Sequence, residues 1–374
     1  MAREEHMLNI MAPINSTSYG IVSLNLLEAF YAISLDEGKV CPALWTLGGN
    51  VEAATEKHKV LGECLKSAEL YNRKWNSLRI WHQFDLAPRI GDSLASAYSF
   101  FELDKLKSSE SHQMASLDWM FLPSKWAKSV YDRANSVVVC PGVDTRIFND
   151  KVKPAKFTHP KINNETTIFL NCGKWELRKG HDFLLEAFNN AFGPEDNVFL
   201  IVNSYNACQP AHYSDEWADY YENHSKIGFA GRIHCYRTRL ATQNDVASLM
   251  SFADCGIFPS RAEGWNLEAA EMLAMGKNVI LTDYSAHTEY AVDAACKIID
   301  VEGLEKAEDG TFFHGEGNWA HLGTQSMEQT VNHLRQVHIA KQNGTLQKNA
   351  VGQKLFTETY TWRNAAENIL KAIV

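Results

Sequence analysis

Short apolar runs alternate with longer helical patterns along this chain, and no other feature restricts its fold as strongly. Runs such as "HMLNIMAPI", "SLRIWHQF", "SLDWMFLPS" and "SVVVCPG" are typical of buried strands, whereas residues 23–34 and 125–133 have a helical period. Strands that alternate with helices form βα units around a largely parallel sheet. The sequence therefore predicts an α/β fold.

The alternation is interrupted once, between residues 149 and 164. This stretch, "NDKVKPAKFTHPKINN", is polar and without a period and contains two prolines and four lysines, so we interpret it as an interdomain linker. The strand-like runs then resume with "TTIFLNCG", "NVFLIVNSY", "GFAGRIHCY", "DCGIFPS" and "NVILTD". Because a domain has about 150 residues, a chain of 374 residues predicts two α/β domains, over 1–155 and 156–359.

The composition limits the binding partners and the cellular compartment that we expect for this protein. A formal net charge of -9 argues against a polyanion-binding surface over the whole molecule, although it leaves room for a local basic groove. The eight cysteines form no C-x-x-C pair, which favours free thiols in a reducing compartment over zinc or disulfides. The N-terminus is acidic, and no run approaches the ~18 apolar residues of a membrane span. We expect a cytoplasmic protein with no membrane span.

The first stretch that could carry chemistry is "NCGKWELRKGHDFLLEAF". An apolar strand ends at Gly173, the cations Lys174, Arg178 and Lys179 follow, and a helical pattern begins after Gly180. Cations between the carboxyl end of a strand and the start of a helix are where α/β sheets hold phosphate groups. The alternative is a solvated, charged loop without function.

The second stretch is "RAEGWNLEAAEMLAMGK", residues 261–277, in which Glu263 precedes a helical pattern and Glu271 lies within it. The backbone N–H groups at the start of this helix would suit a phosphate. A carboxylate repels phosphate but accepts two hydrogen bonds, so it suits a sugar diol. The alternative is that Glu263 only complements the helix dipole and that Glu271 is a surface residue.

The spacing E-x7-E in "EGWNLEAAE", preceded by "FPSRA" and followed by "AMGKNVILTD", resembles the nucleotide-sugar site of retaining glycosyltransferases of family 4. In addition, "CGKWELRKG" resembles the diphosphate loop of that family, and "FLPSKWAKSVY" with "VVVCPGVDTRIF" resembles a third segment. The resemblance implies the GT-B fold, with two Rossmann-like domains that face a central cleft. It also implies that the final helix, within 360–374, crosses back to the first domain.

The same resemblance implies roles for individual residues of the second domain. Lys174 and Lys179, after Gly173, would neutralise the donor diphosphate, and Glu271 would bind the ribose diol. Glu263, with the loop at Gly264 and the amides of Trp265, Asn266 and Leu267, would hold the transferred sugar and the phosphate. Two residues depart from the family pattern. Lys174 replaces an arginine, and Asn266 replaces a glycine whose left-handed backbone asparagine tolerates. The Asn266 side chain would crowd or contact the sugar.

In the first domain, "MAPINSTSYGIVSLNLL" resembles the first βα loop of the family, in which Gly20 would let the backbone approach the donor or the acceptor. A tight turn explains Gly20 as well. "RIWHQFDLAP" places His82 at the end of a strand, where the family has a histidine that contacts the donor sugar. The alternative for His82 is a structural histidine.

The resemblance implies a hexosyl- or pentosyltransferase that acts with retention on a nucleotide sugar, with UDP the commonest nucleotide of the family. The leaving phosphate itself would accept the proton of the acceptor hydroxyl. The chain contains no D-x-D, so the lysines would replace a metal ion, and we expect neither metal nor cofactor.

The acceptor is suggested by a second, narrower resemblance. "NIMAPINSTSYG" and "VILTDYSAHTEY" are similar to glycosyltransferases of T4-like phages, some of which modify hydroxymethylated bases in DNA, and such a protein would act in the host cytoplasm. The lysines at 151, 153, 156 and 161 could flank a cleft for DNA. The alternatives are an envelope glycan or lipid-linked acceptor, and a sugar-nucleotide-binding protein without catalysis. The sequence leaves the oligomeric state open.

Overall fold

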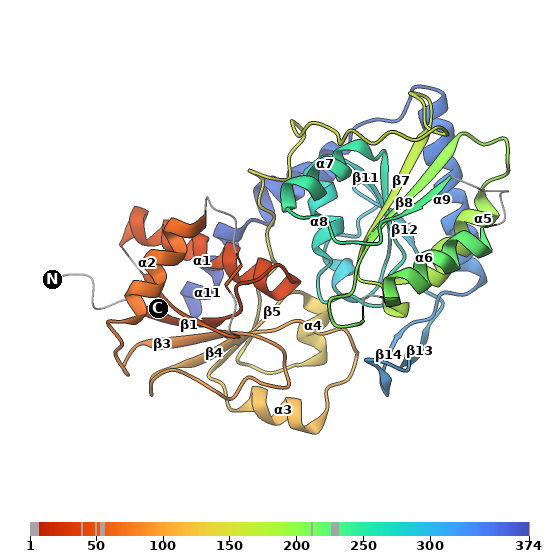
Figure 1. Cartoon of the computed structure of the whole chain (residues 1–374). Helices are drawn as coiled ribbons and strands as arrows, with labels where there is room; N and C mark the ends of the chain where they lie inside the picture. Colours follow the sequence, from red (N-terminus) through yellow and green to blue (C-terminus); the bar gives the residue numbers. More distant parts are fainter. Residues whose placement is uncertain are drawn as a thin grey trace. The chain divides into compact units, whose positions relative to one another are not determined.

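The computed structural model describes residues 7–38, 40–48, 51–52, 57–210, 212–225 and 232–373, which form two compact units. Unit 1 contains the residues up to Asp144 and those from Thr359 onward, and unit 2 is Thr145–Glu358 (Figure 1). Both are α/β units with a parallel six-stranded sheet, as the alternating pattern predicts. Residues 228–231 of the predicted strand "GFAGRIHCY" lie outside the described residues.

Unit 1 is built on a sheet with strand order β2-β1-β3-β4-β5-β6. Its strands are β1 Met7–Ala12, β2 Cys41–Thr46, β3 Asn76–Ile80, β4 Ala95–Tyr98, β5 Trp119–Leu122 and β6 Ser136–Val138. Its helices are α1 Ser18–Glu37, α2 His58–Ala68, α3 Ser108–Ala115, α4 Lys125–Val130 and α11 Trp362–Ile373. Strands β2 and β4 had no clear signal in the sequence, because both follow a polar stretch, β2 contains Pro42, and β4 has only four residues.

Helix α1 is the one described helix that is long and apolar enough, by length and composition, to meet the criterion for a membrane span, which the sequence had not predicted. Its apolar side chains, Leu26, Phe30 and Ile33 among them, are buried within unit 1. The C-terminal helix α11 packs against it, so the returning helix belongs to the core of unit 1. The apolar composition of α1 is thus explained by its burial as a core helix of unit 1.

Unit 2 has the strand order β12-β11-β10-β7-β8-β9. Helices α5, α6 and α9 lie on one side of this sheet and α7 and α8 on the other (Figure 1). The strands are β7 Thr167–Gly173, β8 Val198–Ser204, β9 Ile233–Cys235, β10 Cys255–Phe258, β11 Asn278–Thr282 and β12 Lys297–Ile299. The helices are α5 His181–Ala191, α6 His212–His224, α7 Gln243–Phe252, α8 Leu267–Ala274, α9 Thr324–Gln342 and α10 Ala350–Lys354. An antiparallel hairpin of β13 Leu304–Glu308 and β14 His314–Ala320 completes the unit.

The polar stretch 149–164 belongs to unit 2, so the division after Asp144 comes earlier in the chain than the predicted one after residue 155. The reason is that the stretch is tied to the C-terminal part of α7. The amide of Ala155 donates to the Ser248 carbonyl oxygen, and Ser251 Oγ donates to the Val152 carbonyl oxygen. Because α7 leads into the start of β10, this stretch and its lysines lie at the amino edge of the sheet.

Each sheet reverses its strand order at one point. In unit 1 the chain leaves β1 in one direction and returns to β3 on its other side, and in unit 2 β7 and β10 are related in the same way. The loops that follow two such strands diverge at the carboxyl edge of the sheet and leave a crevice, in which open α/β sheets bind ligands. We therefore expect ligand-binding residues in the loops after β1 and β3 in unit 1 and after β7 and β10 in unit 2.

Candidate functional site

In unit 2, the loops after β7 and β10 are in direct contact. The amide of Arg261 donates to the Arg178 carbonyl oxygen at 2.7 Å. Gly180, with φ 72°, lies so close to the second loop that a Cβ there would be 2.1 Å from the Pro259 carbonyl oxygen. Only glycine fits this position, in conformation and in space. The two charged motifs of the sequence are therefore brought together at the carboxyl edge of the sheet.

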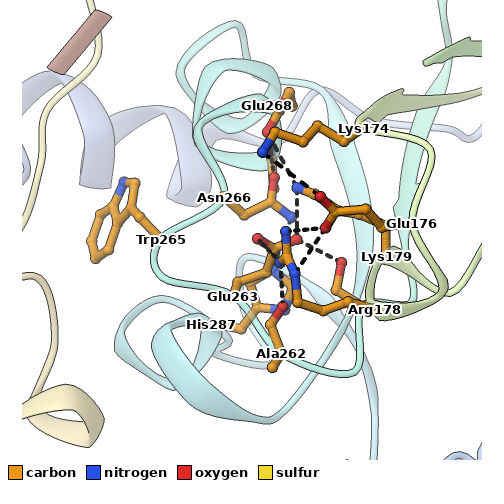
Figure 2. Close-up of polar contacts among 12 residues, drawn as sticks. Lys174, Glu176, Arg178, Lys179, Ala262, Glu263, Trp265, Asn266, Glu268 and His287 are labelled. Carbon is orange, nitrogen blue, oxygen red and sulfur yellow. Dashed lines mark hydrogen bonds and ion pairs between the residues drawn. The ribbon is translucent and has the colours of Figure 1, made fainter. Parts of the chain in front are cut away.

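The Glu263 carboxylate lies at the centre of this contact (Figure 2). Its Oε1 is 2.8 Å from Lys179 Nζ and accepts a hydrogen bond from Ser260 Oγ at 2.8 Å, and its Oε2 is 3.1 Å from Arg178 Nη1. The residue is only 3% exposed. Burial acts to raise the pKa of Glu263, but Lys179 and Arg178 outweigh it and lower the pKa to about 2. Glu263 is therefore a fixed, ionised acceptor.

The Arg178 guanidinium group donates hydrogen bonds to other groups of the protein. It donates from Nε and Nη2 to Glu176 Oε2 at 3.1 and 2.7 Å, and from Nη1 to the Ala262 carbonyl oxygen at 2.7 Å as well as to Glu263. Only 3% of its surface is exposed. Arg178 thus joins Glu176 to Glu263 and helps to fix Glu263, a role that the sequence did not suggest.

The two lysines differ in their surroundings. Lys179 is buried, with Glu268 Oε2 as a second carboxylate 3.8 Å from its Nζ, whereas the side chain of Lys174 is 44% exposed and lies 3.7 Å from Glu176 Oε1. Burial acts to lower the pKa of Lys179, but Glu263 and Glu268 raise it overall, so the ammonium group stays charged. An anion that reached Lys179 would therefore compete with two carboxylates for it.

Asn266 begins α8 in the left-handed conformation, with φ 75°, which confirms that asparagine can replace glycine at this turn. Its side chain is 4% exposed and turned into the protein. Oδ1 accepts from the Ala269 amide at 3.1 Å, and Nδ2 is 2.9 Å from His287 Nε2. Both polar atoms of the side chain thus have protein partners, and its contact with the sugar stays a prediction.

The other predicted residues of unit 2 lie close by in the chain. The Trp265 ring points away from the charged cluster (Figure 2) and packs on Tyr290 and Phe356. Gly264 and Leu267 are buried in the same turn, and Gly173 ends β7 next to the Lys179 side chain. Glu271, on the second turn of α8, is 7% exposed, so it is not the surface residue of the alternative interpretation.

In unit 1, Gly20 and His82 lie at the other point of strand reversal. Gly20 is in the first turn of α1, and a Cβ there would be 2.2 Å from the Asn15 carbonyl oxygen, so its close approach is to its own chain. His82 follows β3, and its ring centroid is 4.3 Å from that of Tyr19 and 5.2 Å from that of Phe84, on which it stacks. The structure therefore gathers the predicted residues into one group in each unit.

Two residues of the site were missed by sequence reasoning. Ser285 Oγ accepts from the Glu263 amide at 2.7 Å, and His287 bonds to Asn266, although both lie about 20 residues further along the chain. Both lie in the segment "VILTDYSAHTEY", but the signal that places them beside Glu263 and Asn266 is topological. Because β10 and β11 are parallel neighbours, the loops that follow them meet.

Two other expectations also bear on the site. The lysines at 151, 153, 156 and 161 lie at the amino edge of the unit 2 sheet, opposite the edge that carries Lys179 and Glu263, so they do not flank this site. Among the described residues, no group of three or more His, Cys, Asp or Glu side chains is arranged to hold a metal ion.

Comparison with known proteins agrees with this geometry. Residues 166–307 match the family model of glycosyl transferases group 1. No protein of curated function matches the chain in sequence. In structure, the chain is similar to an α,α-trehalose-phosphate synthase (UDP-forming) of Burkholderia xenovorans, with a TM-score of 0.66 and 9% identity over 98% of this chain and 99% of that one. It is also similar to sucrose-phosphate synthase of Thermosynechococcus elongatus, with a TM-score of 0.65 and 11% identity, and to HepE of Anabaena in complex with UDP, with a TM-score of 0.63 and 11% identity. Each of these two comparisons covers 98% of both chains.

At such low identity the structural similarities establish the fold alone, which is GT-B, with two Rossmann-like units. The fold and the matched family model together define a glycosyltransferase. Residues 166–307, which match the family model of glycosyl transferases group 1, contain both charged loops of unit 2.

Proposed function

We propose that the protein transfers a hexosyl or pentosyl group from a nucleotide sugar, with UDP as the first nucleotide to test, to a hydroxyl acceptor with retention of configuration. The observation that carries this proposal is the cluster of Lys179, Arg178 and Glu263 beside the start of α8, at the point where the unit 2 sheet reverses its strand order. That HepE was crystallised with UDP and that the trehalose-phosphate synthase is UDP-forming support UDP as the first choice.

In this proposal the donor diphosphate lies between Lys174, Lys179 and the first amides of α8, and Glu271 accepts hydrogen bonds from the ribose diol. Glu263 faces the sugar. In unit 1, His82 contacts the donor sugar, and Gly20 lets the backbone approach the donor or the acceptor. The bond between the anomeric carbon and the phosphate oxygen breaks while the acceptor oxygen bonds to the same carbon. The leaving phosphate takes the proton of the acceptor hydroxyl.

The lysines stabilise the negative charge that grows on the leaving diphosphate. One lost donor of this kind costs about 10²- to 10³-fold in rate. Because Lys179 stays charged in its buried pair with Glu263, it supplies this charge without a metal ion. We therefore propose a reaction that needs neither metal nor cofactor.

For the acceptor we propose a hydroxymethylated pyrimidine in DNA, supported by the similarity of two segments to enzymes of T4-like phages and not by the lysines at the amino edge. A base inside a duplex would have to flip out of the stack. An envelope glycan or lipid-linked sugar is the alternative acceptor. The eight free cysteines favour a reducing compartment, so we propose that the protein acts in the cytoplasm, that of the host if a phage encodes it.

The test is release of nucleoside diphosphate from a panel of nucleotide sugars, with and without DNA that contains hydroxymethylcytosine. Lys179→Met should slow release about 10²- to 10³-fold. Lys341→Met is the matched control, because Lys341 is also ion-paired, to Asp254 at 2.8 Å, but at the amino edge of the same unit. Release that requires the DNA would support the full proposal, and release indifferent to DNA would redirect the search to envelope glycans. Tight nucleotide binding without any release would indicate a binding protein.

A further inference from the structure

Backbone strain in the described part of the chain is concentrated at the candidate site. The two non-glycine residues with positive φ among the described residues are Asn266, at 75°, and Ser285, at 55°. They lie in the loops that follow the neighbouring strands β10 and β11. A left-handed conformation costs a non-glycine residue about 1–2 kcal/mol, so it persists only where the surroundings impose it.

Hydrogen bonds between the two loops show what imposes it. At one end of the segment 263–266, Ser285 Oγ accepts from the Glu263 amide at 2.7 Å, and the Glu263 carbonyl oxygen accepts from the Ala286 amide at 3.2 Å. At the other end, Asn266 Nδ2 is 2.9 Å from His287 Nε2 (Figure 2). Each strained residue thus takes part in one bond that joins the two loops.

His287 can make this bond in only one protonation state. It is fully buried, and its Nδ1 lies 3.0 Å from the Thr282 carbonyl oxygen, which only accepts, so Nδ1 carries the proton. Nε2 is then free of a proton and accepts from Asn266 Nδ2. Asn266 Oδ1 in turn accepts from the Ala269 amide at 3.1 Å. Each bond therefore donates in the same direction, from the first turn of α8 through Asn266 and His287 to the Thr282 carbonyl oxygen.

The electrostatic environment supports the neutral form of this histidine. Burial, with smaller effects of Lys179 and Arg178 in the same direction, lowers the pKa of His287 to about 4 against the opposing charge of Glu263. A protonated imidazole could not accept from Asn266. The neutral ring is therefore the form that keeps the turn in place.

We propose that His287 is a positioning residue of the nucleotide-sugar site, which through Asn266 fixes the direction of the first amides of α8 and so their affinity for the donor diphosphate. This inference rests on the proposed function, because it assigns the diphosphate to those amides. The amides at the start of a helix bind an anion only if they converge on it. His287 would act without touching the substrate.

The test combines His287→Phe, Asn266→Gly and the double variant, with UDP as the probe in calorimetric titrations. His287→Phe should raise the Kd for UDP about tenfold, because it leaves the buried Asn266 amide group without its acceptor. Asn266→Gly should raise it about threefold, because glycine adopts the left-handed turn unaided. In the Asn266→Gly background, His287→Phe should change the Kd less than twofold. Equal effects of His287→Phe in both backgrounds would overturn the proposal.

The control is His333→Phe. His333 also bonds to a carbonyl oxygen, that of Ile298 at 2.7 Å, but it lies on α9 outside the site, so its loss should leave the Kd for UDP unchanged. Hydrogen exchange of the segment 262–270, measured without nucleotide, gives a second readout. Exchange should quicken in His287→Phe and not in His333→Phe, and unchanged exchange would overturn the proposal. The wild type could also fail to bind UDP while exchange still quickens in His287→Phe. That result would support the role of His287 in holding the turn and would count against the proposed function.

Discussion

Lowering the pH from 7 to 5 should remove about 4 kcal/mol from the free energy of unfolding of unit 2. His181 and His287 are both fully buried, and burial lowers the pKa of each from 6.5 to about 4. Below pH 6.5 the unfolded chain binds a proton at each histidine, whereas the folded chain does not until about pH 4. Unfolding therefore takes up protons in this window, and acid favours it.

The magnitude follows from the two pKa values. At pH 5 each histidine contributes a loss of about 2 kcal/mol relative to neutral pH. His234 and His338, whose pKa values burial also lowers, add to the loss in the same direction. Glu263 adds to the loss only at lower pH, between the ordinary glutamate pKa of 4.5 and its pKa of about 2 in the folded protein.

Urea unfolding at pH 7 and pH 5, followed by tryptophan fluorescence, measures the loss. The difference between the two pH values should shrink by about half in His181→Phe and in His287→Phe, whatever each substitution costs at pH 7. The exposed His314 provides a control, and His314→Gln should leave the difference unchanged. Equal stability of the wild type at the two pH values would refute the reasoning.

Three other outcomes are expected. Arg178→Met removes the cation that the buried carboxylates of Glu176 and Glu263 share, and it should cost about 3–5 kcal/mol in urea unfolding. A cost below about 1 kcal/mol would contradict the proposed network. Lys179→Met should slow sugar transfer about 10²- to 10³-fold in a diphosphate-release assay, and an unchanged rate would exclude a role in stabilising the leaving group. Gly20→Ala should lower the free energy of unfolding by about 1–3 kcal/mol, because the added Cβ would clash with Asn15. Gly62→Ala is the control and should raise it slightly, since a Cβ there meets nothing within 4 Å. Equal melting temperatures of these two glycine variants would show that the contact at Gly20 is relieved without cost.

The periodic apolar runs predicted the α/β class, and the motifs predicted which loops of unit 2 carry charge. They could not predict that Arg178 is buried against Glu176 and Glu263, because a triplet of cations has the same sequence pattern whether its members face solvent or carboxylates. Nor could they predict His287, whose bond to Asn266 exists only because β10 and β11 are neighbours in the sheet. Strand β2, the short strands β4 and β12, and the hairpin of β13 and β14 also gave no usable period.

The position of α11 has a consequence for how the chain is made. Unit 2 lies between two parts of unit 1 in the sequence, so the ribosome completes all of unit 2 before it makes α11. During that interval the apolar helix α1 lacks the partner that packs against it in the finished protein. Unit 2 has every strand of its sheet at that stage and can close its core first. Unit 2 is thus the first of the two units to have its whole sequence, and unit 1 must hold α1 partly covered until α11 is made.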